Sequence, residues 1–535
     1  MAIKGSVRIT SAAAALVIAA ALACPVPAGA ATPTSAYWAT PHAVTTKGEV
    51  TVGGLPIRYT AAAGTLILRD SQGRSTGELF YVAYFKDGTD PRRPVTFLYN
   101  GGPGASSAPL HIGAFGPVRV ITADHGNTPP APYSLVPNSY SLLDASDLVF
   151  VDAMGTGFSR ILGADAGGVG TPKTFYGVDS DAASFARFIT GFLSKYRRWN
   201  SPKFLIGESY GTTRSAAVAY DLEQEGVDLN GIVMLSAILN FDLGIVDQPG
   251  LNPGVNLPYA LALPSYAAVA WYQKLLPERP TALRPWLTQV QSWAMGPYLA
   301  ALDQGSALPL AQEERVAAQM SRYTGLTTSY LLRADLRVSG PEFQQQLLLE
   351  RGETTGRLDG RFTGPVADPL AEVATYDPEI SAIGSAYVSA INQYLRSTLH
   401  FGGEHHYLIL SESVSDAWNA QHTPPGQSAP ADIATNVMPD LAAAMTLDPA
   451  LRVMVNAGFF DLATPYSAAV YQMQQLPMQR ELQQNIEYCF YRTGHMLYVA
   501  PGALAQLHAN IVGFIRSANG FAVRKHRGDD CSPSG

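Results

Sequence analysis

The feature that most constrains this chain is a G-x-S-x-G element set between a short apolar segment and an amphipathic one. Residues 203–206 have the pattern of a buried strand, residues 207–211 (GESYG) follow at once, and a helical pattern runs over 209–223. In this context the two glycines let the backbone turn sharply, so the serine hydroxyl stands above the end of a sheet at a helix N-terminus. The arrangement predicts that Ser209 is a nucleophile. The competing interpretation is an ordinary tight turn between a strand and a helix.

Short apolar segments alternate with helical ones along much of the chain. The expected strands cover residues 55–68, 78–85, 95–99, 148–151, 203–206, 232–235, 453–455 and 486–491, and the expected helices cover 179–196, 209–223 and about 502–515. The first two strands are typical of antiparallel pairing. Short buried strands separated by helices are typical of a parallel sheet with helices on both faces. The predicted fold class is therefore α/β, with a mostly parallel central sheet flanked by helices.

Residues 243–449 differ from the rest of the chain. They lack clear β patterns, are rich in Pro, Gln and Tyr, and carry helical patterns such as 382–395. We expect a large, mainly helical insertion that overhangs the ligand crevice at the end of the sheet and acts as a cap. The predicted organisation is a signal peptide at 1–30, a first core part at 31–242, the cap at 243–449, a second core part at 450–520 and a flexible tail at 521–535.

The first thirty residues have the pattern of an export signal. Lys4 and Arg8 form a basic start, residues 11–23 are apolar, and residues 28–30 (AGA) match a small-residue cleavage site. The apolar stretch is too short to cross a bilayer, which takes about 20 residues. A lipoprotein acylated at Cys24 and an uncleaved anchor are the alternatives. We expect a secreted or periplasmic protein with no membrane association unless Cys24 is lipidated.

The amino-acid composition excludes several classes of protein. With 47% hydrophobic and 15% charged residues in 535, the chain is neither disordered nor collagenous. A formal net charge of −7 with scattered basic residues gives no footprint for nucleic acid or anionic lipid. Three cysteines exclude a disulfide-rich scaffold and a cysteine-based zinc module, and a bridge between Cys489 and Cys531 stays open. The histidines of residues 400–406 are more typical of a solvated loop than of a metal site, so we expect no metal or cofactor.

A serine nucleophile needs a base within reach and an acid that orients the base. In α/β-hydrolases the acid and then the histidine follow the serine, each after a later strand of the sheet. Asp461 follows the strand at 453–455, His495 follows the strand at 486–491, and only these two residues satisfy both placements. We therefore predict an α/β-hydrolase fold with a triad of Ser209, Asp461 and His495.

The developing oxyanion needs backbone N–H groups aimed at it. One is the amide of Tyr210, directly after the nucleophile. The second is expected from residues 100–104 (NGGPG), a glycine-rich loop after the strand at 95–99.

Together these motifs resemble the serine carboxypeptidase family, and the leader points to an exported bacterial member. The resemblance rests on five segments in the family's order: 100–107 (NGGPGASS), 151–159 (VDAMGTGFS), 207–211 (GESYG), 458–461 (GFFD) and 494–496 (GHM). It implies a triad of Ser209, Asp461 and His495 and oxyanion amides from Gly102 and Tyr210. It also implies that a peptide's free C-terminal carboxylate is bound by Asn100, Gly101 and Glu208. Glu208 must then be protonated, because two carboxylates in contact do not both stay ionised.

The sequence departs from the family at two positions. Leu98 stands where the family usually has Trp, and Ala114 stands where it usually has a second acidic residue that binds the carboxylate. His111 and Arg119 are the candidates to replace that group. The predicted function is removal of C-terminal residues from peptides through an acyl-Ser209 intermediate. The alternatives are an esterase or acyltransferase with the same triad, and a non-catalytic binding protein on this fold. The sequence does not give the oligomeric state.

Overall fold

The computed structural model describes residues 43–88, 90, 92–245 and 253–518. The predicted signal peptide, Cys24 and the tail that carries Cys531 lie outside the described residues. Export therefore stays a prediction, and lipidation at Cys24 and the bridge between Cys489 and Cys531 stay open.

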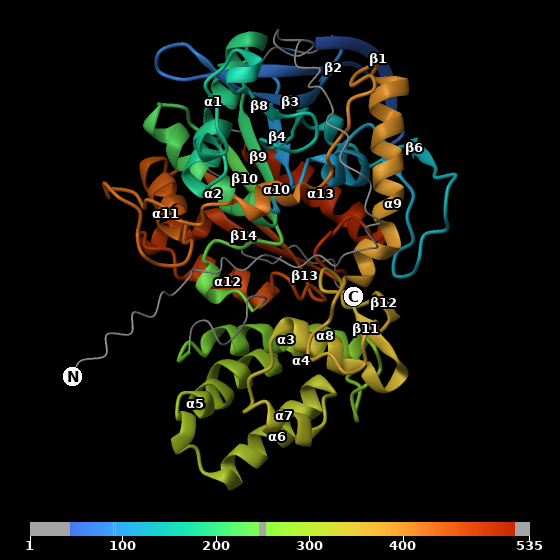
Figure 1. Cartoon of the computed structure of the whole chain (residues 1–535), viewed down its shortest axis with the longest axis vertical. Coiled ribbons are helices and arrows are strands. Elements are labelled where there is room, and N and C mark those ends of the chain that lie inside the picture. Colours follow the sequence, from blue (N-terminus) through green and yellow to red (C-terminus); the bar gives the residue numbers. More distant parts are fainter. Residues whose placement is uncertain (1–42, 89, 91, 246–252, 519–535) are drawn as a thin grey trace, which may run out of the picture.

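One mixed sheet forms the centre of the molecule (Figure 1). Its strands run in the order β1-β2-β3-β7-β4-β9-β10-β13-β14, with β8 paired to β3. Pairing is antiparallel from β1 to β7 and parallel from β7 to β14. The strands are β1 (Ala43–Val52), β2 (Leu55–Arg69), β3 (Ser75–Lys86), β4 (Val95–Tyr99), β7 (Asp147–Val151), β8 (Arg160–Ile161), β9 (Lys203–Glu208), β10 (Gly231–Leu235), β13 (Arg452–Gly458) and β14 (Ile486–Tyr491). The predicted fold class and each predicted strand are confirmed.

The burial of each strand explains why the sequence predicts some strands and not others. Every residue of β4, β7 and β10 is buried, as expected for parallel strands covered on both faces. The antiparallel edge strand β1 was not predicted. It is largely exposed, and only Val50 and Val52 are buried, so its polar outer residues give no clear strand pattern.

Helices cover both faces of the sheet. Within β4, Phe97 belongs to the core cluster of α1, α2, α11 and α12, whereas the next residue, Leu98, belongs to the cluster of α9, α13 and η1. This follows from the alternation of side chains along a strand. The helices are α1 (Val178–Tyr196), α2 (Tyr210–Gln224), α11 (Met438–Leu447), α12 (Tyr466–Gln474), α9 (Pro378–Gln393), α13 (Pro501–Ala518) and the π-helical segment η1 (Pro109–Phe115).

A helical lobe lies beyond one end of the sheet, in the lower part of Figure 1. It consists of α3 (Leu257–Tyr272), α4 (Leu283–Trp293), α5 (Leu299–Leu302), α6 (Leu310–Thr324), α7 (Thr328–Arg333), α8 (Gly340–Leu347) and the hairpin of β11 (Glu353–Thr355) and β12 (Thr363–Pro365). Its apolar core includes Phe459, Phe460 and Leu462, which directly follow β13. The lobe therefore packs on the carboxyl end of the parallel strands. Among the described residues, no helix has both the length and the apolar character needed to cross a membrane.

The expected single insertion at 243–449 needs correction, because only its first part forms this lobe. Ile383 and Tyr387 of α9 share a core cluster with Leu98, and Leu441 of α11 shares the other cluster with the sheet. Helical periodicity shows that α9 and α11 have apolar faces. It does not show that these faces pack on the sheet layers rather than within the lobe. The region is mainly helical, as expected, with only the short strands β11 and β12 among its described helices.

Candidate active site

The backbone of Ser209 adopts the strained geometry of a nucleophile elbow. Its φ is 59° and its ψ is −129°, between the last residue of β9 and the first residue of α2. A positive φ in a residue with a side chain costs about 1–3 kcal/mol and persists only where the surroundings impose it. The side chain remains half-buried rather than enclosed. The elbow therefore presents the hydroxyl at the carboxyl end of the sheet.

The glycines around the elbow are required by close backbone contacts. A Cβ on Gly207 would lie 2.2 Å from the carbonyl oxygen of Gly211. A Cβ on Gly101 would lie 2.4 Å from the amide nitrogen of Tyr210 and 2.7 Å from the carbonyl oxygen of Glu208. The NGGPG loop thus packs directly on the elbow, which brings its amides beside the Tyr210 amide at the N-terminus of α2.

Asp461 and His495 form a buried hydrogen-bonded pair. His495 Nδ1 and Asp461 Oδ2 are 2.8 Å apart, and the residues are 4% and 0% exposed. Asp461 Oδ1 accepts the N–H groups of Ala463 and Thr464 at 2.8 and 2.9 Å, and the Thr464 hydroxyl donates to Oδ2 at 2.7 Å. A carboxylate held in this way accepts a hydrogen bond from Nδ1–H, so Nε2 is left as the basic nitrogen.

The electrostatics of His495 favour its protonated form. Burial alone would lower the pKa of the imidazole, but the charge and hydrogen bond of Asp461, helped by Glu208, raise it above its ordinary value. An imidazole with a raised pKa is a stronger base and holds an abstracted proton more firmly.

Short backbone connections bring His495 to the nucleophile elbow. Ser209 N donates to Leu235 O at 3.0 Å, at the end of β10. The next residue, Ser236, donates its hydroxyl to His495 O at 2.7 Å. Glu208 is also close enough to His495 for the imidazolium charge to lower the carboxyl pKa. The predicted nucleophile and base are thus linked through the successive residues Leu235 and Ser236 at the carboxyl edge of the sheet.

A buried carboxyl group lies beside the elbow. Asn100 Nδ2 donates to Glu208 Oε1 at 2.7 Å, and both residues are at most 4% exposed. Burial raises the pKa of Glu208 to about 7, although His495, Tyr498 and Asn100 act in the opposite direction. Glu208 is therefore protonated in mildly acidic solution and carries an O–H group there.

The position of Asn100 is set by a buried ion pair. Arg214 Nη1 donates to Asn100 O at 2.8 Å, and Arg214 Nε donates to Asp181 Oδ2 at 2.7 Å. Leu110 N at the start of η1 donates to Asn100 Oδ1 at 3.1 Å. Asn100 is thereby fixed on both its backbone and its side chain.

The two residues proposed to replace the missing acid at Ala114, His111 and Arg119, lie in different surroundings. His111 is 1% exposed, its Nε2 is 2.6 Å from the Tyr84 hydroxyl, and its ring stacks on Phe150. Burial lowers the pKa of His111 to about 3, so the ring is a neutral core residue and is wrong as a cation for the carboxylate. Arg119 is half-buried, and its charge acts on the Tyr387 phenol.

Sequence reasoning missed several residues that support the site. Thr464 bonds Asp461, Ser236 bonds His495, and Arg214 bonds Asn100 of the NGGPG loop. Thr464 lies three residues after Asp461, where a hydroxyl that caps a turn carboxylate was a signal available in the sequence. The other two reach their partners only through the fold.

The site contains no assembly of metal ligands. Within the part of the chain that the structure describes, no group of three or more His, Cys, Asp or Glu side chains is placed to hold a metal ion.

Comparison with known proteins finds a match to one family model in the first part of the chain. Residues 60–240, from β2 to the loop after β10, match the family model described as serine carboxypeptidase. Over 203 residues the chain is 27% identical to serine carboxypeptidase-like 35 of Arabidopsis thaliana, which is 35% of this chain and 38% of that protein. The chain therefore spans well under half of the length of this curated relative.

A solved structure extends the likeness to most of the chain. The prohormone-processing carboxypeptidase Kex1Δp of Saccharomyces cerevisiae aligns with 88% of this chain and 93% of its own, at a TM-score of 0.53 and 16% sequence identity. At this identity the likeness establishes the α/β-hydrolase fold.

Proposed function

We propose that this protein is a serine carboxypeptidase, which removes C-terminal residues from peptides through an acyl-enzyme intermediate. The observation that carries the proposal is the buried Asn100–Glu208 pair directly beside the Ser209 elbow. A triad alone supports many acyl transfers. A neutral carboxylic acid and an amide at the same place supply hydrogen-bond donors for a terminal carboxylate.

The chemistry follows from the buried histidine and its acid. Ser209 Oγ attacks the carbonyl carbon of the last peptide bond as His495 Nε2 takes the hydroxyl proton. The amides of Gly102 and Tyr210 bind the oxyanion, and one such donor contributes roughly 3–4 kcal/mol. His495 then gives its proton to the leaving amine, and the terminal residue departs. Water repeats the sequence on the acyl-Ser209 ester, which releases the shortened peptide and restores the hydroxyl.

We assign recognition of the peptide's C-terminal carboxylate to Asn100, Gly101 and Glu208, which lie beside the elbow. Asn100 Nδ2 and the protonated Glu208 donate to the substrate carboxylate, and the Gly101 amide adds a third donor. A substrate without a free carboxylate loses these bonds, and Glu208 is then left buried without its partner. Such a site discriminates strongly, because unpaired buried donors are costly.

An esterase or acyltransferase is the second candidate. Ala114 is fully buried in η1 and His111 is a neutral core residue, so neither supplies a second group for the carboxylate. A weaker carboxylate site would admit acyl substrates that lack a C-terminal acid.

The deciding experiment compares one peptide in three forms: the free acid, the C-terminal amide and a simple ester of its N-acylated last residue. We expect the free acid to lose residues singly from its C-terminus, as followed by mass spectrometry, and the amide to react far more slowly. Faster turnover of the ester with no action on the free acid would favour the second candidate.

The Ser209→Ala variant tests the nucleophile. We expect turnover to fall by at least about a thousandfold with unchanged thermal unfolding, since the hydroxyl is the attacking atom. Failure of a fluorophosphonate probe to label the wild-type protein, together with undiminished turnover in the variant, would instead support a protein that is not a triad enzyme.

We further propose that the protein is exported, with a peptide as its partner in catalysis. The basic start, the apolar segment and the AGA site at 28–30 support this proposal. The relatives named above come from a plant and a yeast, so a bacterial source stays a prediction. N-terminal sequencing of the protein from its native host tests cleavage after Ala30, and mass spectrometry of the same sample detects acylation at Cys24.

A further inference from the structure

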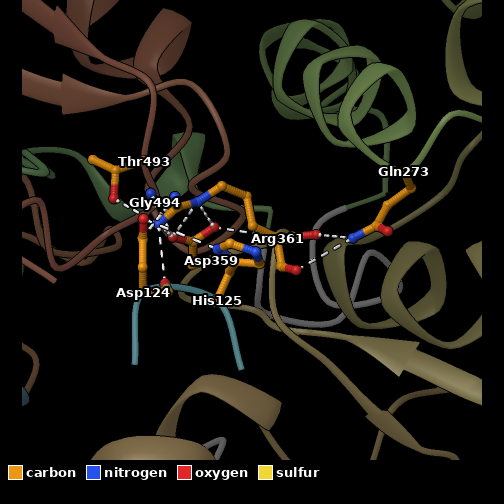
Figure 2. Close-up of polar contacts among 8 residues, drawn as sticks. Asp124, His125, Gln273, Asp359, Arg361, Thr493 and Gly494 are labelled. Carbon is orange, nitrogen blue, oxygen red and sulfur yellow. Dashed lines mark hydrogen bonds and ion pairs between the residues drawn. The ribbon is translucent and has the colours of Figure 1, made fainter. Parts of the chain in front are cut away.

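Residues 357–361 of the insertion contact the loop that carries His495. Leu358 O accepts the N–H of His495 at 2.6 Å, and Asp359 Oδ2 accepts the N–H of Gly494 at 2.9 Å. Figure 2 shows Arg361 reaching the same loop, where its Nη2 donates to Thr493 Oγ1 at 3.1 Å. Three successive residues of the histidine loop are thus bound by one short segment.

The same segment contacts the loop that carries Asp461. Gly360 N donates to Phe460 O at 3.0 Å, and Leu462 N donates to Arg357 O at 3.1 Å. These bonds hold the residues immediately before and after the acid. The 357–361 segment therefore joins both loops of the Asp461–His495 pair.

The contact with the histidine loop is close. A Cβ on Gly494 would lie 2.3 Å from both Leu358 O and Asp359 Cβ. No side chain fits between the segment and the loop, so a displacement of one moves the other.

A buried ion pair keeps the segment in this conformation. Arg361 Nη2 and Nε lie 2.6 and 2.9 Å from Asp359 Oδ2, and the two residues are 6% and 1% exposed. Asp124 Oδ1 accepts from Arg361 Nη1 at 2.9 Å. Burial alone would lower the pKa of Arg361, but the charges of Asp359 and Asp124 raise it above its ordinary value. The guanidinium therefore stays charged and bridges two carboxylates.

The segment is anchored to elements outside the catalytic loops. Gln273 Nε2, at the end of α3, donates to Gly360 O at 2.8 Å (Figure 2). Asp377, which caps α9, accepts the N–H of Leu358 at 2.9 Å on its Oδ2. Both the lobe and α9 thus fix the position of the segment.

We propose that Asp359 and Arg361 are positioning residues, which lock the 357–361 segment so that it holds the Asp461 and His495 loops in register. The inference rests on the proposed function, because the bond that is positioned is the acid–base pair of the triad. Misplacement of a catalytic group by about 1 Å can cost about a hundredfold in rate. The insertion thereby takes part in catalysis without touching the substrate through these two residues.

The test is the double variant Asp359→Asn/Arg361→Met. Removing both members avoids leaving one buried charge unpaired, which is the change most expected to unfold the protein. The matched control is Asp147→Asn/Arg198→Met. It removes a buried pair with a 2.6 Å contact at the start of β7, at the opposite end of the parallel strands. It leaves Arg93, the second partner of Asp147 at 3.0 Å, without that carboxylate, just as the first variant leaves Asp124 without Arg361. Both variants are measured for thermal unfolding, kcat and KM on the free-acid peptide.

We expect kcat of the first variant to fall by 10- to 100-fold with KM changed less than twofold, and kcat of the control to stay within twofold of the wild type. Equal falls in unfolding temperature with equal kcat values in the two variants would overturn the proposal, since the pair would then be only structural. If the first variant does not fold, Arg361→Lys replaces it. Lysine keeps the charge but lacks the fork that reaches Asp359, Asp124 and Thr493 together, so an intermediate kcat is expected and an unchanged kcat refutes the proposal.

A spectroscopic readout separates this inference from the proposed function. The Nδ1–H proton shared by His495 and Asp461 gives a downfield proton resonance, which we expect to broaden or shift upfield in the first variant and to persist in the control. An unchanged resonance would contradict the positioning role even if the wild type cleaved no peptide. Absence of any peptidase or esterase activity in the wild type would refute the proposed function alone.

Discussion

At the scale of single residues, the site depends on groups whose charge is set by burial. Glu208 is a carboxylic acid with a pKa of about 7, so its proton is present below neutrality and lost above it. Asp461 is equally buried, yet it receives hydrogen bonds from two backbone amides, a hydroxyl and an imidazole. Asp461 is thus surrounded by donors, whereas Glu208 has chiefly the Asn100 amide.

The charge of Glu208 predicts a pH dependence of substrate binding. KM for a free-acid peptide should rise as the pH passes about 7, because the ionised carboxylate repels the substrate carboxylate and no longer donates to it. In Glu208→Gln this rise should vanish, since the amide donates at every pH. Initial rates of both proteins between about pH 5 and 9 provide the measurement. The same rise in the variant would show that another group titrates.

Thr464 predicts a measurable role for the hydrogen bond that it makes to the acid. In Thr464→Val, Asp461 Oδ2 loses a 2.7 Å donor, and kcat should fall about tenfold because a hydrogen bond to a charged group is worth about 1.5 kcal/mol or more. Thr190→Val serves as the control, since Thr190 bonds only carbonyls within α1. Initial-rate assays on the free-acid peptide compare the kcat values of the two variants. Equal kcat values would argue against the assigned role of Thr464.

At the scale of elements, the strand–turn–helix of β9 and α2 is completed by the loop after β4. These elements are far apart in the chain, but β4 and β9 are parallel neighbours, so their carboxyl ends meet. The glycine at position 101 then lies against the first amide of α2. The proposed oxyanion site thus depends on strand order and on one residue without a side chain.

Gly101→Ala tests this contact between elements. The new methyl group would lie 2.4 Å from Tyr210 N, and the contact is with backbone on both sides, so the loop must move away from the elbow. We expect kcat/KM to fall by about a hundredfold, the order of magnitude of losing one oxyanion donor. Gly513→Ala, on the exposed face of α13 where nothing lies within 4 Å, should keep full activity. Activity of Gly101→Ala near that of this control would refute the packing argument.

At the scale of the whole molecule, burial raises the pKa of several carboxyl groups, whereas His111, whose pKa burial lowers, acts on stability in the opposite sense. Burial raises the pKa of four carboxyl groups to about 6 or 7: Asp152, Glu208, Asp221 and Glu223. A carboxyl whose pKa is higher in the folded state binds its proton more tightly there, so folding stability falls as the pH rises through these values. His422 acts in the same sense. Its carboxylate partners Asp179 and Asp440 raise its pKa to about 9 despite burial, and its stabilising charge is lost as the pH approaches 9.

The unfolding temperature should therefore be higher near pH 5 than near pH 9. Differential scanning calorimetry across this range is the measurement, and Asp152→Asn with Glu208→Gln should reduce the difference. A maximum of stability at the alkaline end would contradict the burial of these carboxyl groups.

The sequence by itself determined the features that are encoded locally. The elbow could be predicted because the end of the strand, the two glycines and the start of the helix lie within residues 207–211 and their flanks. The loops of Asp461 and His495 could be predicted because each follows a short apolar segment. The central strands of the parallel part of the sheet were predicted for the same reason, since nearly complete burial leaves a short apolar segment.

Only the tertiary structure decided which distant residues complete the site. Arg214 reaches Asn100, and Ser236 reaches the carbonyl of His495, across more than a hundred residues in each case. Asp359-Gly360 is the sequence pattern of a simple turn, and the contacts of the 357–361 segment with the loops of Asp461 and His495 depend on how the insertion folds back. Periodicity reports which face of an element is apolar, but a contact between distant segments is fixed by packing and strand order, which no local pattern contains.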